Sequence, residues 1–85
     1  MNDLNDLRNK IDGIDAQIVK LLLERFAVVK DVADYKKQNG LEIFQKGREA
    51  EVLKKIADKI TSPDCKGYIL DIYQTILETS KKSQI

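Results

Sequence analysis

The chain has 85 residues, which allows one domain at most, and a domain this small is marginal without an added source of stability. Cys65 is the single cysteine and there is no histidine, which excludes an internal disulfide, His-based metal sites and Cys–His or Ser–His nucleophile pairs. The 15 Lys and Arg residues nearly balance the 14 Asp and Glu residues, which argues against a nucleic-acid or polybasic membrane partner.

The location of the protein is predicted from the same features. The N-terminal segment is polar and has no signal sequence, and no apolar run approaches 18 residues. Together with a free cysteine, this favours a cytoplasmic protein. Oligomerisation is the remaining way to add stability.

The first predicted helix covers residues 2–38, and Asn2 or Asp3 can cap its start. Asn39-Gly40 provides a stop. At 1.5 Å per residue the helix would be roughly 55 Å long. Its apolar residues are spaced three and four apart, as in a heptad seam. The seam comprises Leu4, Leu7, Ile11, Ile14, Ile18, Leu21, Arg25, Val28, Val32 and Tyr35.

Two shorter helices are predicted at residues 45–60 and 63–83. Ser62 suits the cap of the last helix and Pro63 suits its first position. These two helices are too short to cover the long seam, so the same helix of a second chain is the simplest partner. The sequence therefore predicts an all-α fold, with three helices in one domain of residues 1–85 and a homodimeric assembly.

Charged residues interrupt the first apolar face. Arg25 occupies a seam position, and Lys36 follows 11 residues later, about 20° away around the helix and roughly 16 Å along it. Arg8 flanks the same seam about 25 Å before Arg25, so no small ligand can touch both on one straight helix. In an antiparallel dimer, Arg8 of one chain could approach Arg25 of the other.

Polar residues also lie on the inward faces of the other two helices. Glu49 lies on the buried stripe of the second, with Arg48 at its edge and Gln45 one turn earlier. Ser80 and then Gln84 continue the stripe of the third at intervals of four.

Each of these residues also has a purely structural interpretation. Arg25 can fix the register of a coiled seam, Lys36 can be a solvated helix end, and Arg48 with Glu49 can be surface. Ser80 and Gln84 can mark the frayed end of the third helix. Together, however, polar groups on the inward faces of three helices favour a site for a small anion, because unpaired buried charges are costly. Such a site acts by positioning and electrostatic stabilisation.

The whole pattern resembles the all-helical chorismate mutases. It consists, in order, of Leu7-Arg8, Ile11, Ile14-Asp15, Leu22-Leu23, Glu24-Arg25, Val32, Lys36, Arg48-Glu49, Ser80 and Gln84. The resemblance implies an intertwined homodimer with two active sites. It also implies the Claisen rearrangement of chorismate to prephenate, in phenylalanine and tyrosine biosynthesis, without a cofactor or metal.

The resemblance also implies a role for each matching residue. Arg25, with Arg8 from the other subunit, would bind the substrate carboxylates, assisted by Arg48 and supported by Ser80. Lys36 and Gln84 would hydrogen-bond the ether oxygen, and Glu49 would hold the ring hydroxyl. Gln45 departs from the pattern, because the family often has an acidic residue there, and we expect weaker or altered binding of the hydroxyl.

Two alternatives remain open at this point. One is an isochorismate-pyruvate lyase on the same scaffold, and the other is a non-catalytic helical dimerisation module.

Overall fold

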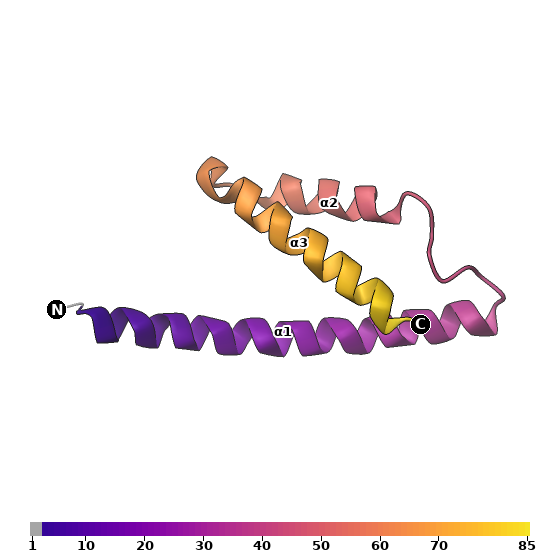
Figure 1. Cartoon of the computed structure of the whole chain (residues 1–85), viewed down its shortest axis with the longest axis horizontal. Helices are drawn as coiled ribbons and strands as arrows, with labels where there is room; N and C mark the ends of the chain where they lie inside the picture. The colour runs from indigo at the N-terminus through magenta and orange to yellow at the C-terminus, as the bar shows by residue number, and fades with distance from the viewer. Residues whose placement is uncertain (1–2) are drawn as a thin grey trace.

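The computed structural model describes residues 3–85, which form three α-helices and no strand (Figure 1). The helices are α1 (Leu4–Gln38), α2 (Arg48–Lys59) and α3 (Pro63–Ser83). The predicted all-α class with one very long first helix is therefore confirmed. Asn2, the predicted first residue of that helix, lies outside the described residues.

Helix α1 has 35 residues and sets the longest dimension of the described chain, which measures 58 × 25 × 16 Å. The carboxylate of Asp3 caps its start by accepting a hydrogen bond of 2.9 Å from the backbone N–H of Asp6. At its other end, Gly40 takes a left-handed conformation with φ 66°. The backbone N–H of Leu41 then bonds to the carbonyl of Lys36 at 2.8 Å. The predicted stop at Asn39-Gly40 is confirmed.

Helix α2 begins at Arg48, not near Gln45 as predicted. Gly47 precedes the helix with φ 84°, a left-handed conformation that interrupts the helical backbone. Gln45 instead lies in the preceding connection, where its amide donates to the carbonyl of Glu42. Pro63 opens α3 as predicted, but the side chain of Ser62 at the cap position makes no capping hydrogen bond.

Helix α3 packs against α2 and crosses the C-terminal half of α1, as Figure 1 shows. The contact with α1 contains the two apolar residues that are buried among the described residues, Ala33 and Leu77, and the buried Ser80. So small a core cannot stabilise a chain of this length on its own.

The N-terminal end of α1 runs beyond both other helices (Figure 1). A row of exposed apolar side chains begins there and continues along most of the helix. We call this row the α1 seam; its exposed members are Leu4, Leu7, Ile11, Ile14, Ile18, Leu21, Val28, Val32 and Tyr35. An apolar surface of this extent usually marks an interaction site. Among residues 3–85, no helix combines the length and hydrophobicity needed to cross a bilayer.

Candidate active site

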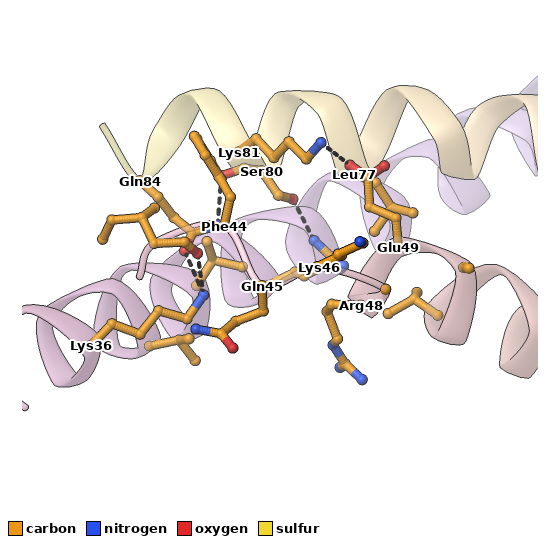
Figure 2. Close-up of a pocket in the computed structure, with 17 residues that line it drawn as sticks. Lys36, Phe44, Gln45, Lys46, Arg48, Glu49, Leu77, Ser80, Lys81 and Gln84 are labelled. Atoms are coloured by element: carbon orange, nitrogen blue, oxygen red, sulfur yellow. Dashed lines mark hydrogen bonds and ion pairs between the residues drawn. The ribbon is translucent and has the colours of Figure 1, made fainter. Parts of the chain in front are cut away.

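A cavity of about 540 Å³ opens where α1, the connection before α2, α2 and α3 meet (Figure 2). This volume is in the range of small-molecule sites. Seven of the eight predicted site residues line the cavity: Arg25, Lys36, Gln45, Arg48, Glu49, Ser80 and Gln84. The eighth, Arg8, is exposed on α1 about 25 Å before Arg25 and does not reach it.

Arg25 and Ser80 connect α1 to α3 at the wall of the cavity. The guanidinium of Arg25 donates to the Ser80 hydroxyl at 2.5 Å, and that hydroxyl donates in turn to the carbonyl of Ile76 at 2.7 Å. Ser80 therefore has both its donor and its main acceptor engaged while it is buried. One arm of the Arg25 fork is fixed, which orients the remaining donors along the cavity wall.

Lys36 and Gln84 form a second connection between the same helices. The ammonium of Lys36 donates to the carbonyl of Ile43 at 2.5 Å and to the side-chain oxygen of Gln84 at 3.3 Å. Figure 2 shows both interactions converging on the Lys36 nitrogen. Gln84 lies directly after the end of α3, and its amide nitrogen reaches back to the carbonyl of Ser80 at 3.4 Å. The cavity thus has a cation and an amide side by side.

Glu49 supplies the single carboxylate that lines the cavity. Its Oε1 lies 2.5 Å from the ammonium of Lys81 on α3, and Figure 2 shows the two side chains directed at each other. The same ammonium lies 5.8 Å from the ring centroid of Phe44. The pair closes the side of the cavity between α2 and α3.

Arg48 lines the cavity at its rim, with its side chain pointing away from Ser80 and Gln84 (Figure 2). Its guanidinium pairs at 2.8 Å with Glu51, which also pairs with Lys55 at 3.2 Å. The hydrogen bond from Lys55, then the charges of Lys55 and Arg48, hold the pKa of the Glu51 carboxyl below its ordinary value. Arg48 would have to leave Glu51 to contact a ligand in the cavity.

Two further cations, Lys46 and Lys81, line the cavity and were missed in the sequence. Lys81 had a detectable signal, because it follows the buried Leu77 by four residues on α3. Lys46 lies in the connection, where helical periodicity gives no guidance. With them, five cationic side chains and one carboxylate line the cavity. Such an excess of positive charge suits a small ligand with more than one negative group.

These groups can bind an anion, orient it and stabilise negative charge. No group of three Asp, Glu, Cys or His side chains that could hold a metal ion occurs within residues 3–85. Fixed donors facing a developing negative charge can stabilise a transition state without any proton transfer.

Comparisons with known proteins give a consistent result. A sequence model of the family described as chorismate mutase type II matches residues 7–85. The chorismate mutase of Methanocaldococcus jannaschii is 39% identical over 87 residues, covering 95% of this chain and 83% of that protein.

Longer bacterial proteins also match. A bifunctional chorismate mutase/prephenate dehydratase of Buchnera aphidicola is 36% identical over 84 residues, covering 98% of this chain but 22% of that protein. The T-protein of Haemophilus influenzae is 38% identical over 53 residues, which cover 62% of this chain and 14% of that protein. The chain therefore spans less than a quarter of these longer relatives.

We expect Ser80→Ala to lower the free energy of unfolding by about 1–2 kcal/mol, because it removes the acceptor that Arg25 uses. Chemical denaturation at fixed protein concentration would measure the change. Ser83→Ala is the control, since it removes an exposed hydroxyl that makes only a local hydrogen bond of 2.7 Å to the carbonyl of Ser80, and it should change stability by less than about 0.5 kcal/mol. Equal effects of the two substitutions would contradict a stabilising Arg25–Ser80 contact.

Proposed function

Because the chain belongs to the type II chorismate mutase family, we propose that it is a chorismate mutase and converts chorismate to prephenate in a single catalytic domain. The observation that carries the proposal is the grouping of Arg25, Lys36 and Gln84 around one cavity, although the first two lie on α1 and the third directly follows α3. Positive donors at both ends of such a cavity suit an extended dianion such as chorismate.

The reaction requires few chemical groups from the protein. In the rearrangement, the ether C–O bond of chorismate breaks while a C–C bond forms between the side chain and the ring. No proton, electron pair or atom leaves the molecule, so no base, nucleophile or cofactor is needed. The protein has to fold the substrate into a compact chair-like geometry and stabilise the charge that grows on the ether oxygen.

Roles for the cavity residues follow from this requirement. Arg25 would clamp one substrate carboxylate, with Ser80 holding its guanidinium in place. Lys36 and Gln84 would donate to the ether oxygen, and one such donor in a dry site contributes about 2.7–4 kcal/mol. Arg48 would assist a carboxylate after releasing Glu51.

The ring hydroxyl of the substrate would lie at the α2 side of the cavity. Glu49 would accept a hydrogen bond from it. Gln45 reaches the cavity from the connection and would offer an amide where the family often has an acidic group. The amide can still hydrogen-bond a hydroxyl, but without the strength of a charged acceptor.

We propose that the active form is an intertwined homodimer, in which α1 of each chain packs on the other. The exposed α1 seam supports this, because it is apolar along most of the helix and uncovered within one chain. An antiparallel partner helix would also bring its Arg8 toward Arg25, which would supply the second carboxylate clamp. The cavity would then be closed from water on its open side, which strengthens its electrostatic interactions.

A product assay tests the proposed reaction against the lyase on the same scaffold. We expect the purified protein to convert chorismate to prephenate, as followed by loss of chorismate and identification of the product. Isochorismate should not yield pyruvate at a comparable rate. Pyruvate from isochorismate without prephenate from chorismate would make the protein a lyase, and no product from either would favour a non-catalytic dimerisation module.

We expect Lys36→Ala to lower kcat by about 100–1000-fold, because it removes a donor to the ether oxygen. The dimer should remain intact in a sizing measurement. Lys37→Ala is the matched control, since Lys37 is adjacent, exposed and outside the cavity, and it should leave kcat unchanged. A fully active Lys36→Ala variant would contradict the role of this ammonium.

The shared site is tested by complementation. Arg8→Ala and Arg25→Ala should each be nearly inactive alone. After mixing in equal amounts, about half of the dimers carry one of each chain and have one intact site, so about a quarter of wild-type activity should return. Each variant mixed with itself is the control. No recovery, with subunit exchange verified by co-purification of differently tagged chains, would contradict a site built from both chains.

A further inference from the structure

Lys81 lies in the cavity but has no role in the mechanism described above. It comes from α3, one residue after the buried Ser80, and its ammonium reaches across to Oε1 of Glu49 on α2 at 2.5 Å. Both side chains are about half exposed, at 46% and 45%. An ion pair that crosses between two helices at the wall of a substrate cavity can do more than stabilise the fold.

The Glu49 carboxylate depends on Lys81 for compensation of its charge. Its Oε1 is buried and has no hydrogen-bond partner of good geometry among the described residues, so the nearby ammonium is its main counterpart. Arg48 is adjacent in sequence but is paired with Glu51 and points away. Oε1 is therefore engaged with Lys81, while no contact holds the second oxygen within the described residues.

The ammonium itself is held by a second contact. Its nitrogen lies 5.8 Å from the centroid of the Phe44 ring, within the range of a cation–π interaction. Phe44 belongs to the connection before α2, so Lys81 links α3, α2 and the connection around one side of the cavity. Because the Phe44 ring already restricts the Lys81 side chain, pairing with Glu49 costs less rotamer entropy than it would for a free lysine.

We propose that Lys81 is a positioning residue, which holds Oε1 of Glu49 so that the other carboxylate oxygen faces the ring hydroxyl of the substrate. The proposal rests on the proposed function, because the hydroxyl belongs to chorismate. Lys81 acts through Glu49 and does not need to touch the substrate. Lys81 would also compensate for the missing acidic group at Gln45. With Gln45 uncharged, the Glu49 carboxylate alone binds the hydroxyl, and Lys81 keeps that carboxylate well oriented.

The test compares two substrates: chorismate, and an analogue in which hydrogen replaces the ring hydroxyl. We expect Lys81→Met to lower kcat/KM for chorismate about 10-fold, chiefly through KM, which corresponds to the loss of one oriented hydrogen bond. The analogue should be affected less than about 2-fold relative to the wild type, since it has no hydroxyl to lose. Lys81→Arg should restore most of the activity on chorismate, because it can pair with the same oxygen.

Two further variants make the comparison specific. Lys82→Met removes a neighbouring charge that is exposed and outside the cavity, and it should leave both substrates unaffected. Glu49→Gln should itself lower activity on chorismate, and adding Lys81→Met to it should cause little further loss, because both changes disrupt one unit.

The outcomes separate this proposal from the proposed function. A wild-type protein that does not convert chorismate overturns both. If the wild type is active, three results would overturn the role of Lys81 alone. Lys81→Met could have no effect, it could impair both substrates equally, or the activity it loses could add fully to that lost in Glu49→Gln. Equal impairment would mean that Lys81 acts as a general charge in the cavity or as a structural link.

Discussion

The hydrogen bond from Arg25 to Ser80 is the contact on which the arrangement of the site depends. A guanidinium in an otherwise apolar seam is costly unless a partner satisfies it, and the buried hydroxyl of α3 does so at 2.5 Å. This contact brings the end of α3 to the C-terminal half of α1. Once it is made, the next polar pair along the two helices, Lys36 and Gln84, meets on the same side. Two polar contacts thus fix how α3 crosses α1 more specifically than the few buried apolar residues can.

The cavity carries an excess of positive charge that an anionic ligand would balance. Five cations face one carboxylate, and mutual repulsion among them opposes a tightly closed site. The chain restrains several of them with internal acceptors: a carbonyl and an amide for Lys36, Glu51 for Arg48, and Glu49 for Lys81. The cations are thereby oriented before a ligand arrives, and the reorganisation that binding requires is reduced. Arg48 is held by Glu51 in a direction that binding would have to change.

Helical periodicity explains how much of this could be predicted from the sequence. Arg25 and Lys36, and likewise Ser80 and Gln84, were assigned to common faces from their spacing alone, and they line one cavity. The start of α2 was misplaced because the left-handed backbone at Gly47 depends on the path of the connection. The direction of Arg48 was not predictable, because Glu51 three residues later competes for it. The Lys81–Glu49 pair joins two helices, and no repeat within either one encodes such a contact.

In the proposed dimer, helix α1 would serve two purposes that conflict physically. Its apolar residues must remain available for packing against another surface, and few of them are buried within the chain. Its charged residues must remain available for a ligand, which lowers the apolar area that the same helix can bury. The conflict is resolved along the length of the helix: the seam is uncovered at its N-terminal end, whereas Arg25 and Lys36 lie in the half that α3 crosses. In the proposed dimer Arg8 is the exception, since its position in the N-terminal half becomes useful only when another chain brings it to a cavity. An arginine placed there would link assembly to function, because only a correctly paired helix would complete the site.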